Sequence, residues 1–218
     1  MPATKFLSRI LPVAAVTASL LAGVPAADAA KKNGKTVKAT IALGDKRPAK
    51  TVRKAKKAKA KVAAVPCTNT NLLPSAENLE LVRAAILCLH NQIRVQQNLP
   101  ALRDNAKLRK AALGHSASMV SQGYFDHTDL GGDTFVDRIL GAGYAKRNDG
   151  WTLGENLAWG TGDLSTPAGV MQAWMASPGH KANILKKAYR EVGIGIRLGV
   201  PSDTGVGATI TADFGVKL

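Results

Sequence analysis

Apolar residues recur every three or four positions from Leu79 to Ile93, and this spacing predicts an amphipathic helix. We expect Ser75 to cap the start of this helix. The segment before Pro100 should end it, because a residue that precedes proline disfavours the helical conformation. A second helix is predicted over residues 105–122, with Gly123 as its stop.

Two shorter helices follow in the sequence. One is capped by Asp133 or Thr134 and carries apolar side chains over residues 135–140. The other opens at residues 166–167, Thr-Pro, because proline fits the first helical position, and it ends at residues 177–179, Ser-Pro-Gly. A short turn or helix should continue through residues 183–185.

Strand patterns are concentrated in the last third of the chain. Residues 192–198 alternate between branched apolar residues and small or polar ones, a period-two pattern typical of a strand. Residues 201–205 have hairpin-loop composition and precede a returning strand over 208–216, while a further short strand is indicated at 157–159. Helices outnumber strands and the strands look antiparallel, so we predict an α+β domain built in layers.

The N-terminus has the pattern of an export signal over residues 1–29. Two basic residues precede an apolar run over residues 10–24, and small residues stand at the expected cleavage positions, Ala27-Asp28-Ala29. The apolar run is shorter than the about 20 residues of a membrane span, although an uncleaved anchor remains the alternative. We expect an extracellular protein, either free or associated with the cell wall.

The net charge of +15 is concentrated in a tail over residues 30–65. Residues 31–65 hold thirteen Lys or Arg and one Asp, or +12, whereas residues 66–218 hold fifteen basic and thirteen acidic residues, or +2. The tail lacks aromatic residues, so we predict that it is disordered. It serves either as a spacer or as an electrostatic attachment to an anionic surface. No known DNA- or RNA-recognition motif accompanies the tail, which argues against nucleic acid as a partner.

Residues 66–218 remain for one compact domain, which we expect to be monomeric and which is long enough to bury a sizeable core. Cys67 and Cys88 are the only two cysteines. In an exported chain an isolated pair most simply forms one disulfide.

Four residues carry the candidate chemistry of the domain. Two imidazoles and two carboxylates are groups that hold a divalent metal or move protons near neutral pH, and here they are His127, Glu155, His180 and Glu191. Glu155 lies between two tryptophans, where a carboxylate requires a proton, a donor or a cation. Glu191 starts a predicted strand and either joins the site or faces solvent. His90 and His115 are expected to be structural helix residues.

The order of several motifs resembles the CAP superfamily of cysteine-rich secretory, antigen 5 and pathogenesis-related proteins, and in particular its bacterial SCP-like extracellular branch. The resemblance covers roughly residues 79–216. Its motifs are His90-Asn91-Gln92-Ile93-Arg94, Leu99-Pro100-Ala101-Leu102, Phe125-Asp126-His127, Gly154-Glu155-Asn156-Leu157-Ala158, Ser177-Pro178-Gly179-His180, Asn183-Ile184-Leu185, Gly193-Ile194-Gly195 and Asp213-Phe214-Gly215.

The resemblance implies a three-layer α-β-α sandwich with a central antiparallel sheet and a cleft floored by two His and two Glu. His127 and His180 match the two histidines, and Glu155 matches the glutamate of the Gly-Glu-Asn motif. The usual position of the second glutamate holds Ser177. Glu191 is therefore a substitute from a different element, or the cleft has only three members.

The same resemblance implies zinc or another divalent cation at His127 and His180, not essential for folding, and in some members a sterol or fatty acid ligand. We therefore expect a secreted binding module for a small apolar or cell-envelope ligand. The alternative is a metal-dependent hydrolase of wall peptides or proteins, with Glu191 as general base. Neither His-Glu-x-x-His nor Gly-x-Ser-x-Gly occurs, so catalysis is not indicated.

The charge distribution predicts that surface attachment is separable from folding. Deleting residues 31–65 should leave the circular dichroism of the domain unchanged and remove salt-sensitive retention on anionic vesicles or cell walls. Retention of the truncated protein equal to that of the full chain would show that the tail is only a spacer.

Overall fold

A computed structural model defines residues 66–202 and 205–218, so the predicted signal peptide (1–29) and basic tail (30–65) lie outside the described residues. The elements are α1 (Leu79–Gln96), β1 (Arg103–Asp104), α2 (Ala106–Gln122), α3 (Phe135–Gly141), β2 (Trp151–Thr161), the 3-10 helix η1 (Gly162–Ser165), α4 (Pro167–Ala176), α5 (Pro178–Leu185), β3 (Glu191–Leu198) and β4 (Gly207–Lys217).

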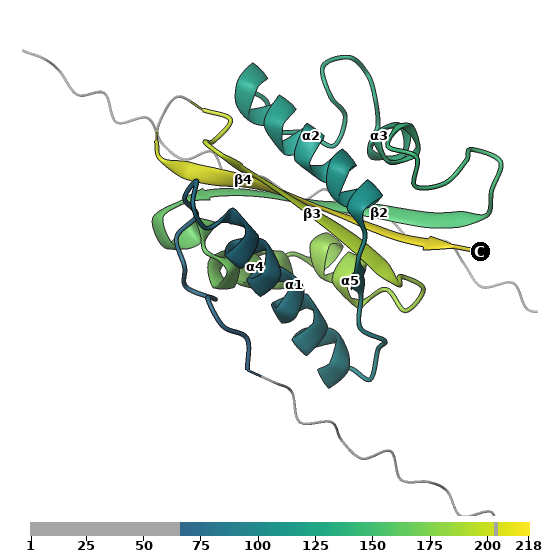
Figure 1. Cartoon of the computed structure of the whole chain (residues 1–218), viewed down its shortest axis with the longest axis horizontal. Helices are drawn as coiled ribbons and strands as arrows, with labels where there is room; N and C mark the ends of the chain where they lie inside the picture. The colour runs from purple at the N-terminus through teal and green to yellow at the C-terminus, as the bar shows by residue number, and fades with distance from the viewer. Residues whose placement is uncertain (1–65, 203–204) are drawn as a thin grey trace, which may run out of the picture. The chain divides into compact units, whose positions relative to one another are not determined.

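The domain is the predicted α-β-α sandwich. One four-stranded sheet lies between two helical layers, with α2 and α3 on one face and α1, α4 and α5 on the other (Figure 1). The strand order is β1-β3-β4-β2, and β4 pairs antiparallel with both β3 and β2. The sheet is not wholly antiparallel, because the two-residue β1 pairs parallel with β3.

Local capping explains where the helices begin. Of the two residues predicted to cap α3, Thr134 is the cap, and Asn105 and Thr166 cap the predicted starts of α2 and α4; each side chain accepts a hydrogen bond from a backbone N–H of the first turn. The prediction for α1 was wrong. Ser75 does not cap this helix; its backbone N–H donates to Oδ1 of Asn78, 2.8 Å away, and closes the turn that precedes the helix.

The strand predicted at residues 157–159 is part of a much longer one. β2 has eleven residues and pairs with β4 along its whole length, from Trp151 opposite Lys217 to Thr161 opposite Gly207. Glycines and the Glu155-Asn156 pair interrupt its period-two apolar pattern, so alternation alone identified only its centre.

Two glycines allow α2 to lie directly on β3. A Cβ atom at Gly193 would collide with the backbone of Leu108 and Arg109, and one at Gly195 would collide with the backbone of Ala112 and Leu113. The alternating glycines of β3 therefore set how closely this helical layer approaches the sheet.

The outer edge of β2 is covered by side chains. Three of its backbone carbonyls, those of Leu153, Glu155 and Leu157, accept hydrogen bonds of 2.8, 3.0 and 2.9 Å from Tyr189 Oη, Asn183 Nδ2 and Trp174 Nε1 respectively. An edge strand with unpaired carbonyls invites pairing with another chain. These three donors protect the edge and also fasten β2 to the layer of α4 and α5.

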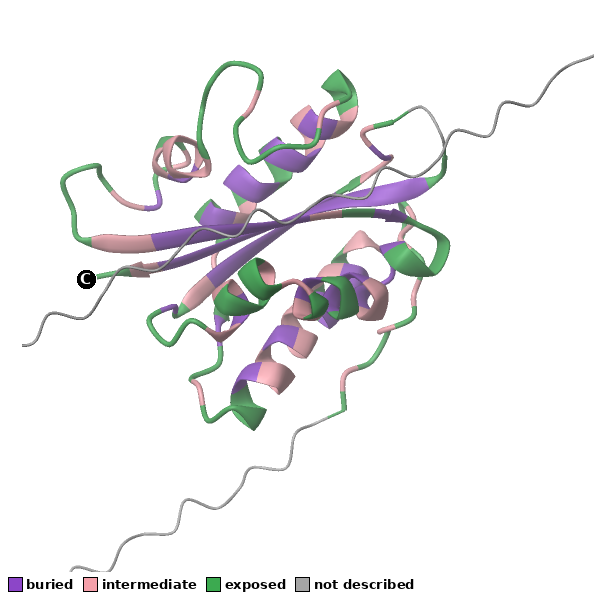
Figure 2. Ribbon diagram, turned by 180° about the vertical axis from the view of Figure 1, so that it is seen from behind, coloured by how far each residue is buried: buried purple, intermediate pink, exposed green. Residues whose placement is uncertain are grey.

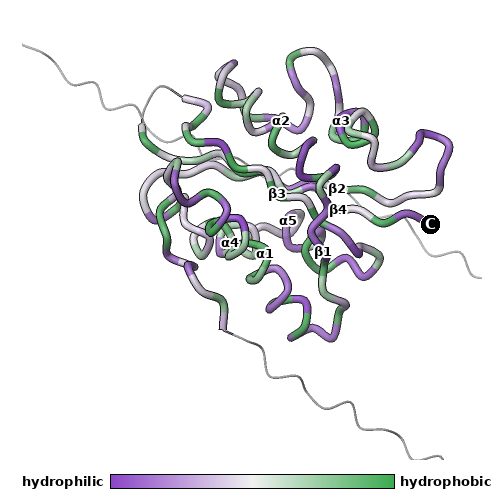
Figure 3. The backbone as a smooth tube through the Cα atoms, viewed as in Figure 1, coloured by the Kyte–Doolittle hydropathy of each residue, from purple (hydrophilic) through white to green (hydrophobic). Residues whose placement is uncertain are grey.

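Buried residues are concentrated in the strands and on the inward faces of the helices (Figure 2). Many hydrophobic residues lie in these same strands and helices (Figure 3). Arg94 of α1 is buried among them, and its guanidinium donates to four backbone carbonyls, those of Pro100, Ile184, Lys186 and Tyr189. It thus ties α1 to the segment between α5 and β3.

The predicted disulfide is confirmed. Cys67 and Cys88 are bonded, with their Cα atoms 5.7 Å apart, so the segment before α1 is fastened to that helix. Within the described residues, no helix is both long and apolar enough to span a lipid bilayer.

His90 is a buried structural histidine, as expected. Its ring lies against Trp174 and Phe214, with ring centroids 5.5 and 5.6 Å away, and Nδ1 bonds the Ile86 carbonyl at 2.9 Å. Nε2 has no hydrogen-bond partner among the described residues. Burial lowers the pKa of His90 from 6.5 to about 4.

This depressed pKa predicts a loss of stability in acid. The unfolded chain binds the proton near pH 6.5 and the folded chain only near pH 4, so stability should fall as the pH drops through this window, by about 3 kcal/mol in total. His90→Phe should remove that share of the loss, as measured by urea unfolding at both ends of the window. Equal losses in the wild type and the variant would contradict the prediction.

Candidate functional site

The site is organised around the buried carboxylate of Glu155 on β2. Its side chain has no exposed surface, and its two oxygens have different partners. Oε1 lies 2.7 Å from Nδ1 of His127, and Oε2 accepts a hydrogen bond of 2.8 Å from Nη2 of Arg138. A buried charge is tolerated only with such partners, so Glu155 holds both groups in place.

His127 lies in the loop between α2 and α3, and 53% of its side chain is exposed. Two contacts anchor this loop: the His127 carbonyl accepts from Arg138 Nη2 at 3.0 Å, and the Asp126 carbonyl lies 2.9 Å from Nε2 of His115. The hydrogen bond to Glu155 is the main cause that raises the pKa of His127. With Nδ1 turned toward Glu155, Nε2 is the ring nitrogen available to a ligand.

His180 reaches the site from the opposite layer, as the third residue of α5. Its backbone carbonyl accepts a hydrogen bond of 3.0 Å from Nδ2 of Asn156, whose own Oδ1 accepts from Asn183 at 2.9 Å. Burial lowers the pKa of His180, and the charge of His127 lowers it further.

The Gly-Glu-Asn motif now has a physical reason. Successive side chains of a strand point to opposite faces, so Glu155 holds His127 on one side of β2 and Asn156 holds α5 and His180 on the other. Position 154 requires glycine, because a Cβ atom there would collide with the hydroxyl of Tyr189. This hydroxyl donates a hydrogen bond to the carbonyl of Leu153.

Glu191 is not brought to the other three residues. Its carboxylate accepts hydrogen bonds of 2.7 Å from Tyr144 Oη and 3.1 Å from Asn105 Nδ2, and Arg103 lies 3.7 Å away. Burial alone would raise its pKa, but these partners leave the pKa of Glu191 below its usual value. The structure therefore places Glu191 in a separate cluster of polar side chains.

Two further residues belong to the site and were not predicted. Arg138 of α3 joins Glu155 to the loop of His127. Asp213 of β4 lies directly opposite Glu155 in the β2–β4 ladder and is only 1% exposed. Asp213 is the only charged residue in the strand predicted over 208–216, and that isolation was the signal that could have found it.

The described residues do not form a ready-made metal site. They contain no group of three or more His, Cys, Asp or Glu side chains arranged to hold a metal ion. Both oxygens of Glu155 are engaged, one of them by the cationic Arg138. Zinc binding through His127 and His180 stays a prediction.

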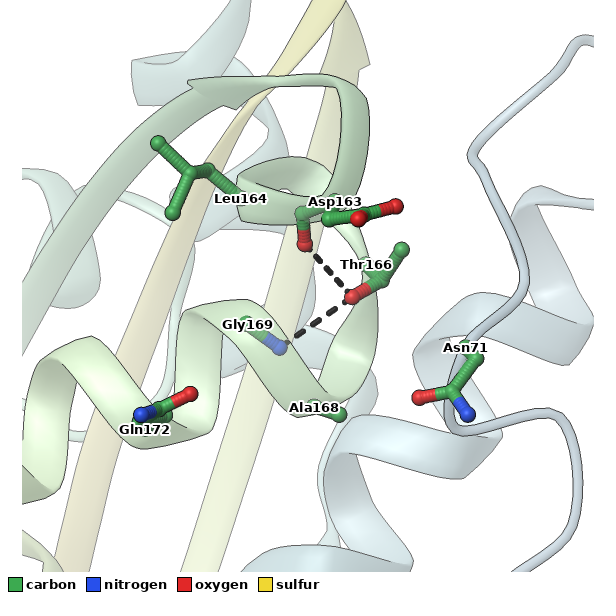
Figure 4. Close-up of a pocket in the computed structure, with 7 residues that line it drawn as sticks. All are labelled: Asn71, Asp163, Leu164, Thr166, Ala168, Gly169 and Gln172. Carbon is green, nitrogen blue, oxygen red and sulfur yellow. Dashed lines mark hydrogen bonds between the residues drawn. The ribbon is translucent and has the colours of Figure 1, made fainter.

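A hollow of about 460 Å³ lies elsewhere, around η1 and the start of α4 (Figure 4). None of the predicted site residues lines it. Its central hydroxyl, that of Thr166, donates to the Asp163 carbonyl and accepts from the backbone N–H of Gly169, so it serves the cap of α4.

Comparison with known proteins agrees with this architecture. A family model described as "CAP: Cysteine-rich secretory protein family" matches residues 87–206, more than half of the chain. The chain belongs to the CAP family. The matched segment includes His127, Glu155, His180 and Glu191, while Asp213 lies beyond it.

Two relatives of similar sequence come from Bacillus subtilis (strain 168). The protein YkwD is 29% identical over 165 residues, which cover 71% of this chain and 62% of YkwD. The membrane protein YlbC is 34% identical over 111 residues, which cover 51% of this chain and 30% of YlbC. The chain thus spans less than two thirds of the length of either relative.

Solved structures of similar fold include an outer surface protein from Borrelia burgdorferi, at a TM-score of 0.52 and 20% identity, covering 67% of this chain and 97% of that one. An extracellular SCP-domain protein from Bacillus anthracis str. Ames has a TM-score of 0.49 and 27% identity, covering 62% of this chain and 42% of that one.

The Glu155–His127 contact predicts how the two histidines titrate. In the wild type, the pKa of His127 should lie above the usual value of 6.5 and the pKa of His180 below it, as measured by NMR of the imidazole protons. Glu155→Gln should lower the pKa of His127, because the main group that raises it loses its charge. Glu191→Gln is the matched control and should leave His127 unchanged; an equal effect of both variants would place Glu191 in the cleft.

Proposed function

We propose that this CAP domain is an extracellular binding module whose cleft at His127 and His180 takes a small apolar ligand with a polar end. The observation that carries the proposal is the exposure of large apolar side chains in the loop of His127 and on the strand of Glu155. Phe125 and Leu130, in the same loop as His127, are 45% and 65% exposed. Trp159 is 45% exposed and follows Glu155 on the same face of β2.

These residues suit the two ends of such a ligand. Full burial of such a side chain is worth roughly 1.5–3 kcal/mol relative to full exposure, so covering one that is about half exposed gains roughly half of that. The imidazoles of His127 and His180 supply donors and acceptors for a polar head group, as is usual in sites that orient a mostly apolar ligand. Sterols and fatty acids have this chemistry.

An extracellular location is supported by the disulfide and by the family. A Cys67–Cys88 bond persists in an oxidising compartment and is rare in the cytosol. The family description names secretory proteins, and the N-terminal residues 1–29 have the composition of an export signal. We do not propose hydrolysis, because Glu191, the general base which that alternative requires, is held by Tyr144 and Asn105.

The test is the binding of a fluorescent long-chain fatty acid to the full chain. Wild-type protein should bind it saturably, and the double change Phe125→Ser and Leu130→Ser should weaken binding by roughly tenfold or more, since apolar contacts of about 1.4 kcal/mol or more are lost. Leu81→Ser is the matched control, because Leu81 is 51% exposed on α1, outside the cleft.

Equal weakening by the control, or no saturable binding, would contradict the proposal. Soluble peptidoglycan fragments should be measured in parallel. If they bind instead and depend on His127, the ligand is a wall component and the apolar class is wrong.

A further inference from the structure

Asp213 is a buried acidic residue to which no donor in the described part of the chain forms a hydrogen bond. It lies in the central strand β4 and is 1% exposed, and neither carboxyl oxygen has a hydrogen-bond partner among the described residues. An ionised carboxylate needs such partners when it is buried, because water no longer solvates it. The described residues supply no such hydrogen-bond partner to an ionised Asp213.

The side chain that Asp213 faces is another carboxyl group. Asp213 and Glu155 are directly paired in the antiparallel ladder, a position that brings Cβ atoms to about 4.5–5.5 Å. On the other side of Asp213, β3 presents Gly193, which has no side chain. Two negative charges at this separation repel strongly when both are buried.

The nearby cation is already committed to Glu155. Arg138 donates through Nη2 to Glu155 and to the His127 carbonyl, and through Nη1 to the Asp133 carbonyl. His127 bonds Glu155 directly, and His115 of α2, which also interacts with Glu155, bonds the Asp126 carbonyl through Nε2. The charge of Arg138 opposes part of the rise in the pKa of Asp213, and its Nε has no hydrogen-bond partner, but in the described part of the chain no hydrogen bond joins Arg138 to Asp213.

We propose that Asp213 is a positioning residue of the cleft: a neutral carboxylic acid that donates its proton in a hydrogen bond to Glu155 and so fixes the carboxylate that holds His127. A protonated carboxyl group is the only state of Asp213 with a donor to offer, and Glu155 is the acceptor opposite it. Burial first, and then the negative charge of Glu155, raise the pKa of Asp213 well above its usual value, in agreement with this arrangement.

The consequence for the site is its charge. The two carboxyl groups under His127 carry one negative charge between them, and Arg138 balances it. A floor of this kind favours a ligand head group that forms hydrogen bonds over a doubly charged cation, which gains most from several ionised carboxylates. The inference concerns the protein alone and stands whether or not the cleft binds an apolar ligand.

The direct test is infrared spectroscopy of the full chain with isotope-labelled aspartate near neutral pH. The carbonyl-stretch band of a protonated carboxylic acid should be present and should carry the label shift. Asp213→Asn should abolish it, whereas Asp137→Asn, at an aspartate whose low pKa keeps it ionised, should leave it. A labelled wild-type chain without this band would overturn the proposal, even if the Asn variant failed to fold.

A second measurement separates positioning from simple packing. Asn retains a neutral donor for Glu155, so Asp213→Asn should leave the pKa of His127 within a few tenths of the wild-type value in an NMR titration. Asp213→Leu removes the donor but keeps the residue neutral and apolar, and should shift the His127 titration. If Asp213→Asn lowers the pKa of His127, Asp213 is ionised in the wild type and the proposal is wrong.

Discussion

The candidate cleft depends on the burial of one carboxylate. Glu155 has no exposed side-chain surface, so its charge must be stabilised by the protein itself. Arg138 does so from α3 and His127 from the loop between α2 and α3, and Arg138 also holds the His127 carbonyl. The loop between α2 and α3 is thereby fastened to the sheet, with its histidine partly exposed.

The position of Glu155 on an edge strand extends this effect to both layers. Its neighbour Asn156 points to the other face and binds the backbone of His180. The edge of β2 is covered by Tyr189, Asn183 and Trp174. The strand that carries the site is therefore fastened on each side, and its two predicted histidines belong to different helical layers.

Periodicity, caps and prolines were sufficient to predict the helices α1 to α4, and alternation was sufficient for β3, although β3 and β4 are buried on both faces. It was insufficient for β2, whose Gly154, Glu155 and Asn156 are present for specific contacts rather than for the core. Family resemblance identified the histidines and Glu155. Glu191 was an uncertain fourth member, and the structure gives it other partners. Arg138 and Asp213 could not be found from spacing, since their roles depend on strand register and helix placement.

The central claim, that the buried Glu155–Arg138 pair organises the cleft, is tested most directly by a double-mutant cycle with Glu155→Gln and Arg138→Met in the free energy of unfolding. Each single change leaves a buried charge without its partner, so each should cost several kcal/mol, and the double variant should cost less than their sum. The account predicts a coupling of roughly 1–3 kcal/mol. Costs that add to within about 0.5 kcal/mol would contradict it.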